Sequence, residues 1–205
     1  MGSLLKQYRV VCSTNKSSRL FETLFGETTF LEIKYFKPSE YVNKYWERYC
    51  EARESSSLNG KMFELIIATL FIREGLLPLY LQAKVAFVPN IEFDSLLYSR
   101  ECGPVAFSLK TSLRERYKQA DLEAIALKYV HRKAKCFLLT LEENECTVVN
   151  EKIKKGEVIG LNRAVLCSSK DFDDLIFDLR KYEFCLAGNI DIIESNQIIT
   201  NDLIQ

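Results

Sequence analysis

The spacing of hydrophobic residues along the chain predicts four helices and one early strand. Residues 38–53 and 171–182 repeat apolar side chains at helical intervals, and residues 61–74 are apolar on nearly every side, as in a buried helix. A fourth helix is predicted over residues 112–131, with its first residue, a serine, as the N-cap. Residues 28–36 alternate polar and apolar side chains and are rich in β-forming residues, which predicts a strand.

Six further segments are short, apolar and bounded by polar or turn-forming residues. This pattern predicts strands at residues 83–88, 91–98, 104–110, 136–141, 146–150 and 164–167. Helices and strands that mix in this order indicate a single α/β domain over residues 1–205, with a mixed central sheet flanked by helices. Within it, residues 58–205 are expected to form the core and residues 1–57 an N-terminal subdomain.

Composition and charge narrow the function classes. Lys plus Arg and Asp plus Glu both number 28, so the net charge is zero, which excludes a uniformly basic nucleic-acid binder and leaves one basic face open. Seven cysteines stand singly beside one histidine, His131, so zinc-finger and dithiol spacings are absent. No apolar run approaches the roughly 20 residues of a membrane span. Scattered cysteines and the lack of a signal peptide predict reduced thiols and a cytoplasmic location.

Two residues of neighbouring predicted strands form a chemically suggestive pair. Asp94 lies within one strand, and Lys110 ends the next strand directly before a helix. Because side chains on adjacent strands can lie opposite each other, the carboxylate and the ammonium group can lie side by side. A carboxylate can hold a divalent cation, and a lysine can orient a water and offset charge on a phosphoryl group. The pair therefore predicts a site where a metal and a water act on a phosphate.

This pattern resembles the PD-(D/E)xK nucleases, whose core is a hairpin that bears Asp and then Glu-x-Lys. Here Phe93 stands in place of the Pro, and Ser108 stands in place of the Glu. The sequence is similar to a subset of type II restriction endonucleases that have Ser at this position and take the missing acid from the following helix. In that subset twelve residues separate the lysine from the displaced Glu, the spacing found here between Lys110 and Glu123.

The same subset has an Arg-Glu-Arg triplet that begins four residues after the lysine, matched here by Arg114, Glu115 and Arg116. Its enzymes read CCGG, CCNGG or CCWGG sites in double-stranded DNA. An Arg side chain can donate two hydrogen bonds to guanine, and a Glu can accept one from the amino group of cytosine. The resemblance therefore implies direct reading of G·C pairs, and a palindromic site implies a homodimer.

The resemblance also implies the catalytic residues and the cofactor. Asp94, Glu123 and the backbone carbonyl of Leu109 would bind Mg2+. Lys110 would position the attacking water, and Glu64, in a preceding helix, would add an acid through a water. The implied activity is Mg2+-dependent cleavage of both DNA strands, with the N-terminal subdomain contacting DNA or the second subunit.

Three of the implied residues also have a structural alternative. Glu115 can be an ordinary exposed helix residue, and Glu64 can pair with a buried basic residue. Glu123 can be a surface helix residue, with Asp121 as the alternative ligand. Trp46 lies among tyrosines, where core packing is favoured over stacking on an extruded base. Two alternative functions stay open: a non-catalytic nuclease-fold module that binds DNA or protein, and a structure-specific repair nuclease.

Overall fold

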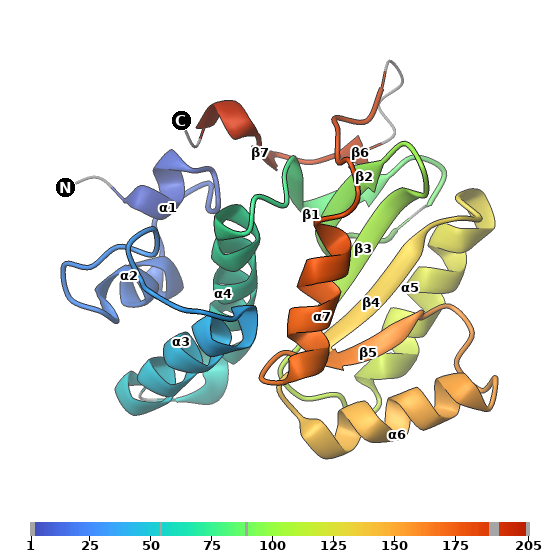
Figure 1. Cartoon of the computed structure of the whole chain (residues 1–205), viewed down its shortest axis with the longest axis horizontal. Coiled ribbons are helices and arrows are strands. Elements are labelled where there is room, and N and C mark those ends of the chain that lie inside the picture. The colour runs from blue at the N-terminus through green and yellow to red at the C-terminus, as the bar shows by residue number, and fades with distance from the viewer. Residues whose placement is uncertain (1–2, 54, 89, 189–192, 204–205) are drawn as a thin grey trace.

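A seven-stranded mixed sheet forms the centre of the computed structural model, which describes residues 3–53, 55–88, 90–188 and 193–203 (Figure 1). The strands are β1 (Leu79–Val85), β2 (Phe93–Ser99), β3 (Gly103–Lys110), β4 (Lys135–Thr140), β5 (Arg163–Leu166), β6 (Ile193–Glu194) and β7 (Gln197–Ile199). Their order across the sheet is β5-β4-β3-β2-β1-β6, and β7 also pairs with β1. Pairing is antiparallel from β1 to β3 and parallel from β3 to β5. The chain therefore has the mixed sheet that the sequence predicts.

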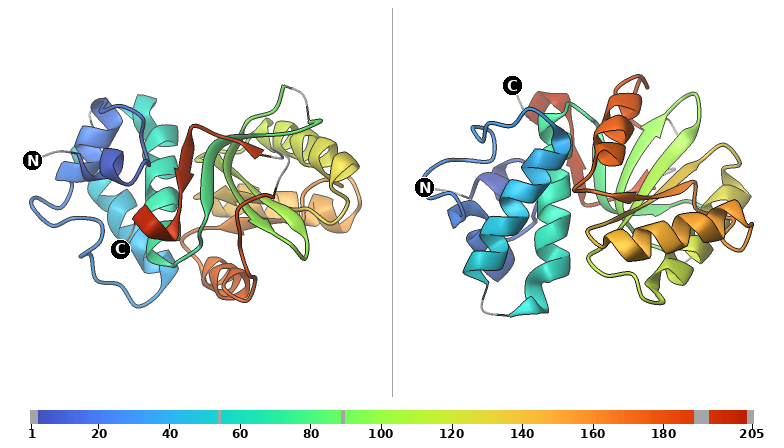
Figure 2. Two further views of the ribbon diagram at one scale, coloured as in Figure 1. Left: turned by 90° about the horizontal axis from the view of Figure 1, so that it is seen from above. Right: turned by 60° about the horizontal axis from the view of Figure 1, so that its bottom comes forward.

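Helices cover both faces of this sheet (Figure 2). They are α1 (Leu4–Gln7), α2 (Lys16–Thr23), α3 (Pro38–Ala52), α4 (Asn59–Arg73), α5 (Arg116–Val130), α6 (Glu143–Lys154) and α7 (Lys170–Leu179), with 3-10 turns η1 (Ser56–Leu58) and η2 (Asn201–Leu203). One buried cluster joins α4 and α7 to the sheet, and a second joins α5 and α6 to the other face. No helix in the described ranges is long and apolar enough to cross a membrane.

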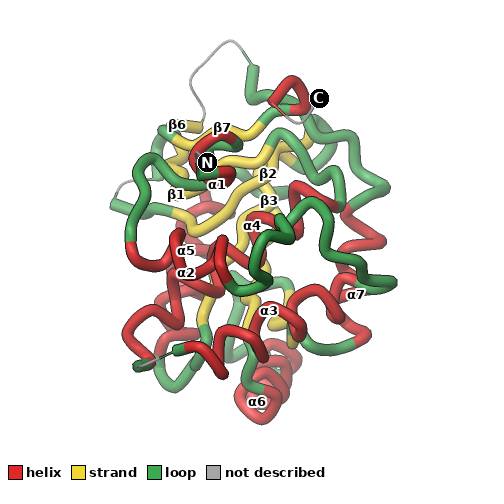
Figure 3. The backbone as a smooth tube through the Cα atoms, turned by 90° about the vertical axis from the view of Figure 1, so that its left-hand side faces the viewer, coloured by secondary structure: helices red, strands yellow, loops and turns green. Residues whose placement is uncertain are grey.

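The helix α4 lies between the sheet and the N-terminal helices, which Figure 3 shows in front of it. It is buried on all sides, with ten buried residues from Met62 to Ile72. Against it packs α3, which buries Tyr41, Tyr45 and Tyr49 at intervals of four residues. Residues 3–53 thus share one core cluster with α4 rather than packing separately.

The segment 28–36 is not a strand, so that prediction is wrong. It runs as turns and loop, and the carbonyls of Phe30 and Ile33 accept hydrogen bonds from the guanidinium group of Arg73 at 2.6 and 3.0 Å. The side chains of Phe30 and Ile33 are buried in the core. The alternation that resembled a strand thus comes from single apolar side chains that anchor a loop.

Two predictions in the second half of the chain are also wrong. The strand predicted at 146–150 is part of α6, because Cys146 and Val149 lie one helical turn apart and both face the core. The helix predicted from residue 112 begins only at Arg116, since the backbone amides of Leu113 and Arg114 both donate to the carboxylate of Glu145. That carboxylate turns the segment into a loop.

Candidate active site

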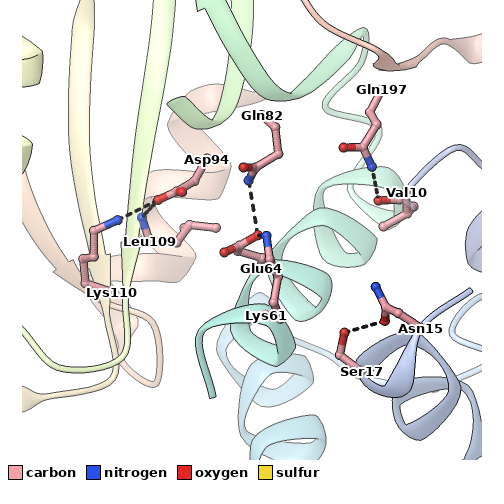
Figure 4. Close-up of polar contacts among 10 residues, drawn as sticks. All are labelled: Val10, Asn15, Ser17, Lys61, Glu64, Gln82, Asp94, Leu109, Lys110 and Gln197. Atoms are coloured by element: carbon pink, nitrogen blue, oxygen red, sulfur yellow. Dashed lines mark hydrogen bonds and ion pairs between the residues drawn. The ribbon is translucent and has the colours of Figure 1, made fainter. Parts of the chain in front are cut away.

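Asp94 and Lys110 lie side by side on the adjacent strands β2 and β3, and we call them the central pair (Figure 4). Lys110 Nζ donates to Asp94 Oδ2 at 3.0 Å, and the backbone amide of Leu109 donates to the same oxygen at 2.7 Å. Each charged side chain keeps 19% of its surface exposed. The pair is therefore shielded from bulk water yet open to a ligand.

The second oxygen of Asp94, Oδ1, has no hydrogen-bond partner within the part of the chain that the structure describes. The N–H and C=O of one residue in an extended strand point to the same side. Because the amide of Leu109 points at Asp94, its carbonyl also faces the Asp94 side of β3. A carboxylate oxygen and a carbonyl oxygen are thus directed toward the same region.

Glu64 projects from α4 toward this region, with 25% of its side chain exposed. Its Oε2 accepts a hydrogen bond from Lys61 Nζ at 2.8 Å and another from Gln82 Nε2 at 3.2 Å. Burial raises the pKa of the Glu64 carboxyl, Lys61 opposes that rise, and the negative charge of Asp94 adds to it. Glu64 is therefore an acid coupled to the central pair.

The sheet bends at the row that carries Asp94. In the pairing of β1 with β2, Leu81 pairs with Ser95 and Ala83 with Phe93, so Gln82 and Asp94 lie between the same two pairs. Leu81 packs in the cluster with α4, whereas Ala83, two residues later, packs in the cluster with α5. Residues two apart in a regular strand share a face, so the chain turns over between them, where Gln82 has a φ of 47°. This bend lets the Gln82 amide reach Glu64 on α4.

Glu123 lies on α5, which packs on the opposite face of the sheet from α4. It is partly buried, and its Oε1 accepts a hydrogen bond from Gln119 Nε2 at 2.7 Å. Burial raises the pKa of its carboxyl, which Gln119 and Lys110 lower and Asp94 raises again. Glu123 thus interacts electrostatically with the central pair, and its hydrogen bond to Gln119 stays within its own helix.

Asp121, the alternative ligand, has a structural role. It is buried, and its Oδ1 accepts hydrogen bonds from the backbone amides of Gly160 and Leu161 at 2.6 and 3.1 Å. At Gly160 a Cβ would clash with the backbone of α5, so only glycine fits this close approach. Asp121 therefore fastens the loop before β5 to α5.

The donors around the central pair are all hard oxygen atoms. Within the described ranges, no three His, Cys, Asp or Glu side chains are grouped so that they could enclose a metal ion. Mg2+ commonly binds one or two carboxylates and fills its remaining positions with waters and substrate phosphates. The Asp94 carboxylate, the Leu109 carbonyl and one flanking acid are suitable donors for such a cation.

A cavity of about 210 Å³ opens beside these groups. Its polar wall includes Lys61, Glu64, Gln82 and Asp94, and its other wall is formed by residues 10–17 of the N-terminal region. Figure 4 shows Gln197 of β7 donating to the carbonyl of Val10 at this second wall. Both chain ends thus border the space that the acidic groups face.

The Arg-Glu-Arg triplet is exposed at the end of β3. Arg114 has a φ of 38°, Glu115 forms an ion pair with Lys118, and Arg116 begins α5. Buried Leu113 and the bonds to Glu145 fix the loop that carries them. All three side chains are therefore presented to solvent from an anchored loop.

Sequence reasoning missed four residues that hold the site in place. Lys61 and Gln119 could have been predicted from the sequence, because each lies one helical turn before the acid to which it donates a hydrogen bond. Gln82 and Glu145 belong to elements remote from the groups they hold, so only tertiary structure reveals them. Trp46 packs against Tyr49 and Phe63, as the favoured reading predicts.

No family model and no curated protein matches this sequence. Among solved structures, the fold is similar to that of the restriction endonuclease PspGI in a complex with its substrate DNA. The two share 16% sequence identity at a TM-score of 0.50, over 76% of this chain and 71% of the other. The chain therefore has a restriction-endonuclease-like fold, as the sequence resemblance implies.

Proposed function

We propose that this protein is a type II restriction endonuclease that cleaves both strands of DNA at a palindromic site with CC and GG halves. The observation that carries the proposal is the central pair, Asp94 with Lys110 at 3.0 Å, flanked from opposite sides by Glu64 and Glu123 in a restriction-endonuclease-like fold. We further propose that Mg2+ is the cofactor and that the active form is a homodimer.

The residues around the central pair would divide the work of hydrolysis. Asp94 and the Leu109 carbonyl would hold Mg2+, with Glu123 as the second acid and Glu64 acting through a water. When bound, this cation supplies positive charge that stabilises the developing charge on the phosphate. The Lys110 ammonium group has three donors, of which one bonds to Asp94, so the others can orient the attacking water and contact a phosphate oxygen.

The exposed triplet would supply the sequence preference. Arg114 and Arg116 would each read a guanine, and Glu115 would accept a hydrogen bond from a cytosine amino group, after leaving Lys118. Each correct contact contributes about 1–3 kcal/mol of discrimination. Because the triplet directly follows the strand of Lys110, base reading and cleavage share one rigid support.

End sequencing of digested DNA tests this function. The protein is incubated with unmethylated DNA of mixed sequence in Mg2+ or in EDTA, beside the variants Lys110→Ala and Lys170→Ala. Lys170 is an exposed lysine paired with Asp174, so its variant controls for loss of a surface charge. We expect discrete, Mg2+-dependent ends at a shared CC and GG site, kept by Lys170→Ala and lost by Lys110→Ala. No cleavage, or ends that persist in Lys110→Ala, would contradict the proposal.

A further inference from the structure

We propose that Gln82 is a positioning residue, whose amide fixes the Glu64 carboxylate beside Asp94 so that Glu64 can help to hold a divalent cation through a water. The inference rests on the proposed function and extends it to a residue outside the nuclease motif. Gln82 donates to Glu64 Oε2 at 3.2 Å and lines the same cavity as Asp94. In the β1–β2 pairing, both residues lie between the pairs Leu81–Ser95 and Ala83–Phe93.

The backbone of Gln82 is in a conformation that glutamine does not favour. Its φ of 47° lies in the left-handed region, which is unfavourable for a non-glycine residue and persists only where the surrounding structure holds it. A glycine or an asparagine would fit this bend at lower cost. The glutamine side chain, however, reaches from β1 to α4, where its amide forms the hydrogen bond to Glu64. A glycine could not form this bond.

Glu64 has two donors on the same oxygen, and their chemistry differs. Lys61 is charged and 59% exposed, and its ammonium group offsets the negative charge that would attract a cation. The Gln82 amide is neutral, so it orients the carboxylate without cancelling its charge. The two side chains should therefore affect cation binding in opposite directions.

Mn2+ binding to the full-length protein without DNA tests this difference, with free Mn2+ measured by its paramagnetic resonance signal. Gln82→Gly removes the amide and suits the left-handed backbone, and we expect it to weaken Mn2+ binding roughly 10- to 100-fold while the melting temperature stays equal or rises. Lys61→Ala removes the other donor and should leave Mn2+ binding unchanged or a few-fold tighter. A Gln82→Gly protein that binds Mn2+ like the wild type overturns the inference.

A double-mutant cycle shows whether Gln82 acts through Glu64. On a Glu64→Gln background, Gln82→Gly should change Mn2+ affinity by less than about twofold. An equal loss on both backgrounds, or Mn2+ binding that does not depend on Glu64, overturns the positioning role. Arg9→Gly, at an exposed residue that also has a left-handed backbone, controls for relief of backbone strain and should leave Mn2+ affinity unchanged.

The cleavage assay on the same proteins separates this inference from the proposed function. If the wild type shows Gln82-dependent Mn2+ binding but cuts no DNA, the proposed function fails and the positioning role stands. If the wild type cuts DNA and Gln82→Gly binds Mn2+ normally, the function stands and the positioning role fails. Where both hold, excess Mn2+ should restore most of the turnover of Gln82→Gly, as expected for a defect in cation binding.

Discussion

The two acids that flank the central pair are held in different ways. Glu64 receives hydrogen bonds from Lys61 of its own helix and from Gln82 of the sheet, so it is fixed across the interface between α4 and β1. Among the residues that the structure describes, only Gln119, one turn earlier in α5, donates a hydrogen bond to Glu123. This bond moves with the helix and leaves the acid free to change rotamer. One side of the site is thus positioned by the fold, and the other is positioned by a single local contact.

The helices that carry the two acids, α4 and α5, also differ in how firmly the fold holds them. The helix α4 is buried on all sides between the sheet and the N-terminal helices, so it cannot shift without disturbing the core. The helix α5 begins at the exposed triplet, and Glu123 follows Arg116 by about two turns. We therefore expect the α4 side to be organised before DNA binds, and the α5 side to be completed when the triplet contacts bases.

The strongest test removes the group that both acids share. Asp94→Asn keeps the shape of the side chain but loses its charge, so neither flanking acid retains a partner for holding a cation. The loss of several kcal/mol of transition-state stabilisation predicts a fall in cleavage rate of about 10³-fold or more. Single-turnover cleavage of a cognate duplex measures it, with Asp174→Asn, on the exposed surface of α7, as the matched control. A loss below tenfold would remove Asp94 from the catalytic site.

Cleavage at limiting Mg2+ compares the supports of the two acids directly. Gln82→Gly should slow the reaction roughly 10- to 100-fold, since it releases an acid that the fold has positioned. Gln119→Ala should slow it less than about threefold, because an exposed bond between neighbouring turns contributes only about 0.2–0.5 kcal/mol. Equal losses in the two variants would mean that both sides are equally organised, contrary to the comparison.

The sequence predicted the central pair because its geometry is local. Alternation in two adjacent strands and a following helix sufficed to bring Asp94 and Lys110 together, and the spacing to Glu123 pointed to α5. The bend at Gln82 could not be predicted, since nothing in its neighbours demands a left-handed glutamine. Likewise, Glu145 binds amides about 30 residues away in the chain.

The ends of the chain were missed for another physical reason. The helix α1 and the strands β6 and β7 are two to four residues long, too short to show a period, and they form because tertiary neighbours are present. The prediction for segment 28–36 was wrong for the opposite reason: the sequence has the alternation of a strand, but in the structure the segment pairs with no described strand. Periodicity therefore predicted α4 and β2, which border the cavity on one side, and not the chain ends that border it on the other.

The loop that carries Arg114, Glu115 and Arg116 allows a further test of the α5 side. Glu145→Ala removes the acceptor for the amides of Leu113 and Arg114, so the triplet loses its anchor while its own side chains stay intact. We expect the ratio of cleavage at the cognate site to cleavage at sites with one altered base pair to fall about 3- to 10-fold, a part of the value of one base contact.

The control for this loop variant is Glu143→Ala, an exposed acid in the same first turn of α6. It removes an equal charge from the same helix end and should leave the ratio unchanged. If Glu145→Ala discriminates as well as the wild type, the triplet does not depend on its anchor, and DNA alone must order the loop. The expected link between base reading and Glu123 would then lose its structural support.

The smallest effect concerns stability and distinguishes the two acids by burial. The pKa of Glu64 is raised in the folded protein, so between its unfolded and folded values the native state binds more protons than the unfolded state. Stability contributed by the protonated form is therefore present at low pH and lost as pH rises through the folded pKa.

At pH 7.5 the ionised Glu64 opposes folding, and Glu64→Gln should raise the melting temperature by up to about 2 °C. At pH 4 the difference should shrink, and Glu123→Gln, whose acid is held within one helix, should show the smaller gain at either pH. A lower melting temperature for Glu64→Gln at pH 7.5 would show that the hydrogen bonds of the Glu64 carboxylate stabilise the fold by more than the burial of its charge destabilises it.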